Sequence, residues 1–513
     1  MANESRVKKT ILNARVNLTF YFLTLVLSFF SRKIFLGTLG TDFIGLTSTL
    51  TNLLSFLNLA ELGISTAIGY VLYKPLFEHD QLKINEIISV FGYLYRWVGK
   101  IIFFCGCILS IFLPIIFPNT GFNLVIIYFA YYSFLASSLI GYFVNYRQTL
   151  LGADQKNYVV TVYFQTVNII KTLIQITSAY YTGNYYIWIA IELTFGIIYS
   201  FILNWKINQV YPWLKSDAKS GKFLYKKYPV VMKYTKQLFI HKIATLVQNQ
   251  TTPFLIYAFV SLQTVTYYGN YTILTEKIKQ LFDNFLGSTA AGIGNLIAEG
   301  NKDKILRVYW EMMSLRFFIV SVGTISLYYI LPPFIKLWLG NEYILPDEIL
   351  ILILGIFSLN ILRGTTDQFI SGHGLFYDIW APMTEAIIFF ITALICGSIW
   401  QLKGLLLANI ISLLIIVYGW KPYFLFKKGF NLSLWIYWLG ILKLLILFGV
   451  ALFLFKMVNT LFIMNNENYN WFELILLSLY ISTTFAFIQF ILLYLGTNGM
   501  KNLIKRLFIK RQP

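Results

Sequence analysis

The chain has 513 residues, of which 58% are hydrophobic and 12% charged, and its formal net charge is +19. This balance excludes an ordinary soluble protein. Apolar runs of about 20 residues recur along the whole length, as in a polytopic all-α membrane protein and unlike the short alternating segments of a membrane β-barrel. The basic residues cluster between these runs, so they indicate an anionic inner leaflet, and nucleic acid is not an expected partner.

About fourteen membrane-spanning helices are expected, with both termini in the cytoplasm. Lysine and arginine are concentrated in the segments that this arrangement places inside, which supports an even number of spans. The expected spans are 14–36, 43–73, 87–117, 122–146, 158–181, 186–206, 238–261, 268–298, 309–335, 346–370, 378–400, 403–426, 434–462 and 471–496.

The spans suggest two pseudo-symmetric lobes of six helices, followed by a C-terminal pair. Gly269 and Gly287 follow Gly45 and Gly63 by the same number of positions, as in an internal duplication, although glycines in membrane helices also agree by chance. Duplicated transporters place their sites at the interface between the repeats. The expected parts are an N-terminal lobe at 1–210, a cytoplasmic linker at 211–237, a C-terminal lobe at 238–430, and two extra helices with a basic cytoplasmic tail at 431–513.

Ionisable residues at membrane depth are the candidate site residues, because each costs roughly 2.5–3.5 kcal/mol at a helix centre. Arg32 lies at the outer end of the first span, where it either anchors the interface or attracts an anionic head group. Glu61 lies in a glycine-containing apolar stretch with no cation beside it, which favours a structural or coupling role. Lys171 and Glu192 fall in the middle of the fifth and sixth spans.

The eighth span is the most polar. Its residues Glu276, Lys279 and Asp283 are spaced i, i+3, i+7, so they share one helix face. That face either lines a cavity or is neutralised by pairing of Lys279 with one of the two acids.

Three further charges lie in later spans. Arg316 either faces the cavity or extends toward the cytoplasmic side, whereas Arg363 and Asp367, at i, i+4, form either a structural pair or a gate. Cations suit a phosphate group, and carboxylates suit coupling to Na⁺ or H⁺. The expected substrate-binding cations are Arg32, Lys171, Lys279, Arg316 and Arg363, and the expected coupling or gating acids are Glu61, Glu192, Asp283 and Asp367.

Other chemistries find little support in the sequence. The three cysteines fit neither a disulfide framework nor a metal site, and no phosphate-binding GxxxxGK motif indicates an ATP-driven pump. The outside turns are too short for the external site of a polymerase or glycosyltransferase. We therefore expect no catalytic residue, no bound metal and no cofactor, with the coupling ion left open.

Several short motifs are shared with a known transporter family. They are Ser31-Arg32, Leu39-Gly40, Ile44-Gly45-Leu46, Leu59-Ala60-Glu61-Leu62-Gly63-Ile64, Leu72-Tyr73-Lys74-Pro75-Leu76, Tyr95-Arg96, Gly292-Ile293-Gly294-Asn295-Leu296, Glu299-Gly300, Pro382 and Glu385. In these residues the chain resembles bacterial polysaccharide flippases of the O-antigen and capsule type, the polysaccharide-transport branch of the multidrug/oligosaccharidyl-lipid/polysaccharide exporter superfamily.

The resemblance implies fourteen helices, an inward/outward rocking cycle and a central cationic cavity. It also implies export of an undecaprenyl-diphosphate-linked oligosaccharide across the bacterial cytoplasmic membrane, with the bilayer and other polysaccharide assembly proteins as partners. Arg32, Glu61, Arg96 and Glu385 match family motifs. Ala386-Ile387 stands where the family often has Asn-Leu, which puts one polar contact in doubt.

A drug/cation antiporter of the same fold is the alternative. It would favour a more acidic cavity, whereas the mixture of charges here favours an anionic cargo. The sequence leaves the identity of the glycan and the driving force open.

Overall fold

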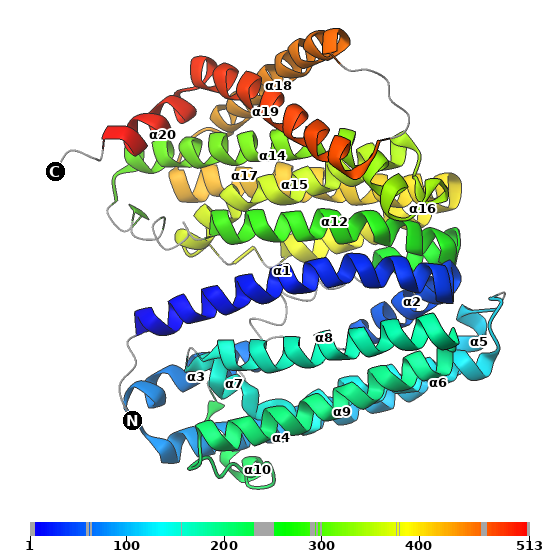
Figure 1. Ribbon diagram of the computed structural model, residues 1–513. Coiled ribbons are helices and arrows are strands. Elements are labelled where there is room, and N and C mark those ends of the chain that lie inside the picture. Colours follow the sequence, from blue (N-terminus) through cyan, green and yellow to red (C-terminus); the bar gives the residue numbers. More distant parts are fainter. Residues whose placement is uncertain are drawn as a thin grey trace. The chain divides into compact units, whose positions relative to one another are not determined.

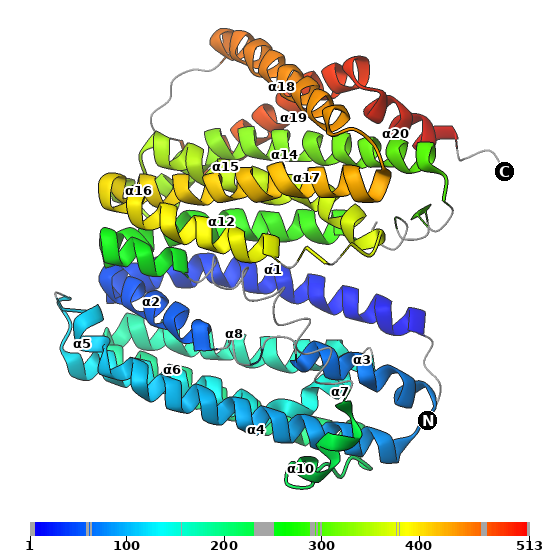
Figure 2. The ribbon, with the colours of Figure 1, turned by 180° about the vertical axis from the view of Figure 1, so that it is seen from behind.

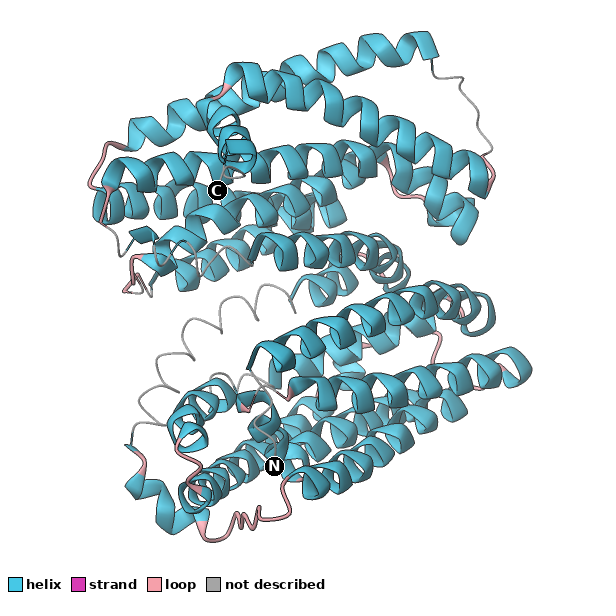
Figure 3. Ribbon diagram, turned by 60° about the vertical axis from the view of Figure 1, so that its left-hand side comes forward, coloured by secondary structure: helices cyan, strands magenta, loops and turns pink. Residues whose placement is uncertain are grey.

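The computed structural model describes residues 6–57, 61, 64–118, 120–154, 156–229, 251–287, 293, 296–297, 300–375, 377–378, 380–462 and 469–509. These residues are mostly helical and include no strand, which confirms the all-α class (Figure 3). The chain divides into two compact units, Met1–Thr266 and Tyr267–Pro513. The predicted boundaries of the two lobes stay a prediction, and residues 230–237 of the expected linker lie outside the described residues.

Ten helices in the described part of the chain are long and apolar enough to cross a membrane, so the protein is a multi-pass membrane protein. Of the remaining expected spans, 238–261 and 268–298 fall partly outside the described residues. The ten are Arg15–Leu39, Gln81–Ile111, Leu124–Phe143, Asn157–Thr182, Tyr185–Val210, Lys302–Trp338, Asp347–Gly372, Trp380–Phe430, Leu434–Asn459 and Trp471–Gly496.

Unit 1 is a bundle of long helices. Helix α1 (Arg6–Leu39) packs on α8 (Asn157–Thr182), and α8 packs on α9 (Tyr185–Val210). Helix α6 (Leu124–Phe143) contacts both α9 and α4 (Gln81–Ile111), as Figures 1 and 2 show from opposite sides. This packing positions polar side chains of α6, α8 and α9 around one internal space.

The turn between α8 and α9 shows how the sequence sets these helix ends. Gly183 ends α8 in a left-handed conformation at φ 57°, which glycine adopts without a steric penalty. The Asn184 side chain then accepts hydrogen bonds from the backbone N–H groups of Tyr186 and Ile187 and so caps the start of α9. The two helices are therefore joined by a short turn with satisfied backbone groups.

The prediction of one continuous span at 43–73 was wrong. The structure has two helices there, α2 (Thr41–Leu57) and α3 (Ile64–Phe77), with Glu61 described between them. Between these helices only Glu61 is described, and it is not α-helical and accepts hydrogen bonds from Tyr95 and Tyr142 of other helices, whereas residues 58–60 and 62–63 lie outside the described residues. Helix α3 packs on α4 and on the short α7 (Gln148–Ala153).

The described part of the expected linker, 211–229, is bound to the start of α4. The backbone N–H of Lys215 donates to Asn85 at 2.7 Å, and the backbone N–H of Asp217 donates to Ser89 Oγ at 3.0 Å. A Cβ on Gly221 would lie 2.1 Å from the Ser89 carbonyl oxygen, so only glycine fits this close approach. Backbone N–H groups of Lys219 and Ser220 hold the pKa of Asp217 below its usual range. This segment therefore forms an ordered part of unit 1, including the short helices α10 (Gly221–Leu224) and η3 (Tyr225–Lys227).

Unit 2 is built around α14 (Lys302–Trp338). Helices α15 (Asp347–Gly372), α19 (Trp471–Gly496) and α20 (Asn498–Ile509) pack on it, and α18 (Leu434–Phe462) packs on α19 (Figure 1). Most of α12 (Leu262–Gly287) also belongs to this unit.

A helical hairpin completes unit 2. It comprises α16 (Trp380–Ser412), η5 (Leu413–Trp420), α17 (Lys421–Phe424) and η6 (Leu425–Phe430). The helix breaks at Gln401, at φ 49° and ψ −130°, and the ring centroids of Trp380 and Trp420 are 4.5 Å apart. The chain therefore reverses at Gln401, and the expected spans 378–400 and 403–426 correspond to the two arms.

The hairpin turn gives a prediction about stability. A Cβ on Gly404 would lie 1.9 Å from the Cys396 carbonyl oxygen, so Gly404→Ala forces the two arms apart and should destabilise the fold by about 2 kcal/mol. Gly419→Ala is the matched control, because its Cβ would meet its nearest neighbour at 3.5 Å. Thermal unfolding of the detergent-solubilised chain measures both, and equal melting temperatures for the two variants would contradict this account of the turn.

Candidate transport site

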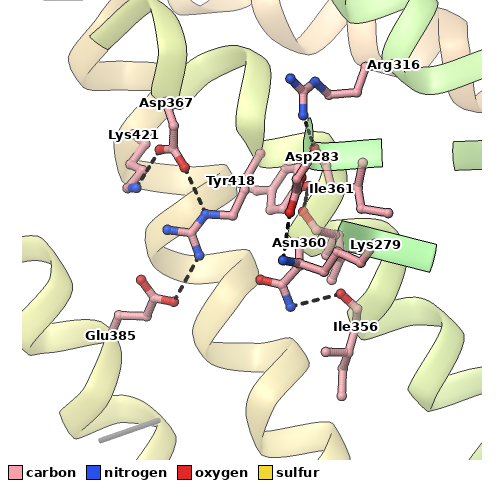
Figure 4. A network of polar contacts seen from close by, with 12 residues as sticks. Lys279, Asp283, Arg316, Ile356, Asn360, Ile361, Asp367, Glu385, Tyr418 and Lys421 are labelled. Atoms are coloured by element: carbon pink, nitrogen blue, oxygen red, sulfur yellow. Dashed lines mark hydrogen bonds and ion pairs between the residues drawn. The ribbon is translucent and has the colours of Figure 1, made fainter. Parts of the chain in front are cut away.

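Four charged side chains of unit 2 form a continuous chain of ion pairs. Asp367 accepts from Arg363 Nε at 3.0 Å and from Lys421 Nζ at 2.6 Å. A second nitrogen of Arg363, Nη1, lies 3.7 Å from Glu385 Oε1 (Figure 4). Arg363 and Asp367 are one helical turn apart on α15, while Glu385 and Lys421 come from the two arms of the hairpin. Opposite charges therefore alternate across three segments.

Arg316 lies beside this chain, inside unit 2. Its side chain is 2% exposed and donates to the backbone carbonyl of Ile361 at 2.9 Å. Among the described residues no carboxylate lies within ion-pair distance of it. A Cβ on Gly364 would lie 2.2 Å from Arg316 Nη1, so the glycine makes room for the guanidinium. The structure places Arg316 in the interior rather than extended toward the membrane edge.

The third part of this site is on α12. Lys279 Nζ lies 2.8 Å from Asp283 Oδ2, and the two side chains are 26% and 42% exposed. Glu276 is exposed and forms no ion pair within the described part of the chain. The pairing of Lys279 with one of the acids, which was one of the two alternatives, is therefore present, and both side chains are also partly exposed. Whether this face lines the central cavity stays a prediction.

Together, seven charged residues of unit 2 form what we call the unit 2 charge cluster. Its described members comprise one more cation than carboxylates: the cations are Lys279, Arg316, Arg363 and Lys421, and the carboxylates are Asp283, Asp367 and Glu385. Tyr418 adds a half-buried neutral donor, which bonds to the Leu359 carbonyl at 2.6 Å. The cluster therefore carries excess positive charge at membrane depth.

Unit 1 contains a separate ion pair. Lys171 Nζ lies 2.7 Å from Glu192 Oε1, and Gln175 donates to the other oxygen of Glu192 at 3.1 Å. Together with Asn145 and Asn168, the pair lines a cavity of about 410 Å³ among α6, α8 and α9. A predicted substrate-binding cation and a predicted coupling acid are thus bonded to each other.

Glu61 is held by two phenols. Tyr142 donates to one carboxylate oxygen at 3.0 Å, and Tyr95 donates to the other. Both tyrosines are buried, at 6% and 7% exposure. The described partners of Glu61 are thus neutral donors, and its predicted coupling role remains a prediction.

Arg32 and Arg96 lie in unit 1. Arg32 Nη2 donates to the Thr266 carbonyl at 3.3 Å, and its side chain is half-buried. Arg96 is half-exposed on α4 and interacts electrostatically with Asp217. Neither arginine is part of the unit 2 charge cluster.

Sequence reasoning did not select several partners that the fold brings in. Lys421 was not among the candidate site residues, although it bonds to Asp367 from 54 positions away. Gln175 and the two tyrosines of Glu61 carry no charge and so gave no signal. Glu385 was singled out only through the family resemblance.

Comparison with known proteins places the fold in a class. No family model and no curated protein sequence matches the chain. Among solved structures it is similar to the lipid II flippase MurJ in an inward-closed conformation, with TM-score 0.61 and 15% identity over 97% of this chain and 100% of that one. It is also similar to an inward-facing multidrug resistance MATE family transporter of the MOP superfamily, with TM-score 0.59 and 12% identity over 80% of this chain and 97% of that one.

At these identities the likeness establishes the fold alone. The chain has an all-helical fold similar to that of a lipid flippase and of a multidrug transporter. The comparisons do not separate the polysaccharide-transport branch from the others.

Proposed function

We propose that the protein is a flippase that exports an undecaprenyl-diphosphate-linked oligosaccharide across the bacterial cytoplasmic membrane, by alternating access, for assembly of a surface polysaccharide such as O-antigen. The observation that carries the proposal is the excess cation of the unit 2 charge cluster, above all the buried Arg316 without a carboxylate partner among the described residues. The fold shared with a lipid II flippase supports it.

The cargo explains why such a cluster is useful. A diphosphate is an anion, and its passage through hydrocarbon requires compensating positive charge. Lys279 and Arg363 are 26% and 24% exposed, so both can offer donors to phosphate oxygens. Arg316 lies behind them and contributes positive potential without contacting the cargo. A drug/cation antiporter would need the opposite excess of charge.

Coupling to an ion fits the pairing of Lys279 with Asp283. When a diphosphate binds Lys279, Asp283 loses its ion-pair partner, and the Asp283 side chain is 42% exposed. A carboxylate freed in this way attracts Na⁺ or H⁺. In this proposal cargo and ion bind in linked steps at one pair, while Glu61, Glu192 and Asp367 remain further coupling or gating candidates.

The proposed setting follows from the cargo. The chain lies in the bacterial inner membrane with both termini in the cytoplasm, where it works with other polysaccharide assembly proteins. This orientation rests on the excess of lysine and arginine in the segments assigned to the inside.

Deletion of the protein tests the proposal in a strain where no second flippase substitutes. We expect undecaprenyl-linked repeat units to accumulate on the inner leaflet, as judged by enzyme accessibility, with loss of surface polymer. The wild-type chain should restore both, whereas Arg316→Met should not. A normal pool and normal surface polymer after deletion would reject the flippase proposal.

The alternative remains a drug/cation antiporter, which the similarity to a multidrug transporter and the exposed acid Glu276 favour. Efflux of a cationic dye under an imposed Na⁺ or H⁺ gradient, in vesicles containing the purified chain, is the test of this alternative.

A further inference from the structure

Unit 2 contains a cavity with several polar groups in its lining, and none of its lining residues belongs to the unit 2 charge cluster. It has a volume of about 400 Å³ and lies among α14, α18 and the start of α20. Its polar lining includes Arg307, Lys443, Trp310, Thr497, Asn498 and Asn502. Nothing in the proposed transport cycle uses these groups.

The two cations of this cavity form no ion pair with described residues, although Glu311 attracts Arg307 electrostatically. Arg307 and Lys443 are both exposed, and neither forms an ion pair within the described part of the chain. Of the nearby acids, Asp303 is exposed at the rim and makes no ion pair with Arg307, one turn away. Glu311 is 3% exposed and is paired with Arg506 at 3.1 Å. The cavity therefore offers two cations to a single unpaired carboxylate.

The depth of Lys443 makes this arrangement costly without an anion. Lys443 is nine residues beyond the first residue of α18, about 14 Å along the helix axis. It lies inside a segment, Leu434–Asn459, that is apolar enough to span a membrane. An ammonium group at such a depth needs either a path to water or a counter-anion, and its side chain points into the same cavity as Arg307.

The walls of the cavity are closely packed. A Cβ on Gly440 would lie 1.9 Å from the Trp310 ring, and a Cβ on Gly499 would lie 2.4 Å from the Trp310 carbonyl oxygen. Helix α20 is fixed to α14 by Met500 and Leu503, which are 2% and 5% exposed. The two cations are thus presented from helices whose spacing is set by side-chain packing.

The surroundings indicate that the anion carries acyl chains. Next to Lys443 on α18, Leu439, Leu442 and Leu445 are 64%, 54% and 52% exposed, which in a membrane protein is a lipid-facing surface. Ile436 and Leu444 extend this apolar surface into the cavity lining. A cationic pocket continuous with a lipid-facing surface matches a phospholipid better than a free ion.

We propose that this cavity binds the phosphate head group of an anionic membrane phospholipid. Arg307 and Lys443 bind the phosphate, Asn498 and Asn502 donate hydrogen bonds to the head group, and the exposed side of α18 contacts the acyl chains. The site holds a structural lipid at the junction of the C-terminal helices with α14. This inference rests only on membrane embedding and is independent of the proposed cargo.

Native mass spectrometry of the full chain in detergent tests the site, with phosphatidylglycerol and phosphatidylcholine of identical acyl chains as probes. We expect preferential binding of phosphatidylglycerol, weakened about tenfold or more in the Arg307→Gln/Lys443→Gln double variant. Lys456→Gln is the matched control, because Lys456 is exposed on the same helix outside the cavity. Arg307→Lys keeps the charge and should retain most of the binding.

Two further arms separate the sources of phosphate. Inorganic phosphate at the same concentration should not displace the lipid, and undecaprenyl diphosphate should not compete for the site. Equal binding of both phospholipids, unchanged binding in the double variant, or displacement by either competitor would overturn the proposal. Thermal unfolding without added lipid verifies that each variant is folded. None of these outcomes depends on the leaflet distribution of the cargo, so they test the lipid site separately from the proposed function.

Discussion

Asp367→Asn should destabilise unit 2 by about 3 kcal/mol. The substitution keeps the shape of the side chain but removes the charge that Arg363 and Lys421 share at 3.0 and 2.6 Å. Both cations are largely buried, at 24% and 14% exposure, so Lys421 would lose its described carboxylate partner and Arg363 would keep only the 3.7 Å contact to Glu385. We expect the lower end of the usual free-energy cost of breaking a buried ion pair, because Asp367 itself keeps about a third of its surface exposed. Thermal unfolding of the detergent-solubilised protein measures this loss.

A second substitution should reverse part of this effect. Asp367→Asn/Lys421→Met removes one cation together with the shared carboxylate and should recover a substantial part of the lost stability. Glu348→Gln is the matched control, because the Glu348–Lys403 pair is 68% and 46% exposed and should contribute less than about 1 kcal/mol. An Asp367→Asn variant as stable as Glu348→Gln would show that the ion-pair chain has no structural role.

Arg316→Met should reduce transport without reducing the stability of the fold. Arg316 is 2% exposed, and its Nε has no hydrogen-bond partner within the described part of the chain, so an apolar side chain of similar length should leave the fold equally stable or stabilise it slightly. The same substitution removes the excess positive charge of the unit 2 charge cluster. Transport of an anionic cargo should therefore fall about tenfold or more, because a single buried charge contributes at least 1.4 kcal/mol in such a site.

The measurement for Arg316→Met combines thermal unfolding with transport in proteoliposomes. Lys456→Met is the control, since it removes an exposed cation of α18 that lies outside the cluster. Full transport activity in a folded Arg316→Met protein would show that the excess charge does not serve the cargo. Loss of folding instead would mean that Arg316 has a structural role.

The membrane fold could be predicted from the sequence because hydrophobic runs and basic segments report it directly. Positions of helix breaks were harder to predict. The break between α2 and α3 lies within a long apolar stretch, where hydropathy alone does not register a change of direction. The reversal at Gln401, by contrast, falls where the expected spans 378–400 and 403–426 meet, although the positive φ of this non-glycine residue was not predicted.

The contacts of the candidate site also divide into those that the sequence predicted and those that it did not. Arg363–Asp367 and Lys279–Asp283 are one helical turn apart, so their pairing followed from helix periodicity. Lys171–Glu192 joins two helices, and the bonds from Tyr95 and Tyr142 to Glu61 depend on how three segments pack. No local sequence pattern predicts contacts between residues that are far apart in the chain. A search for charged residues also does not find uncharged partners such as tyrosine.

In the proposed function, the protein moves a lipid-linked anionic saccharide between the two leaflets of the membrane. The most direct test reconstitutes the purified chain in liposomes with fluorescently labelled undecaprenyl-diphosphate-linked oligosaccharide and follows its accessibility to a membrane-impermeant quencher. The account predicts rapid exchange between leaflets with the wild-type chain and at least tenfold slower exchange with Arg316→Met. Unchanged distribution of the saccharide, together with gradient-driven efflux of a cationic dye by the same preparation, would contradict it.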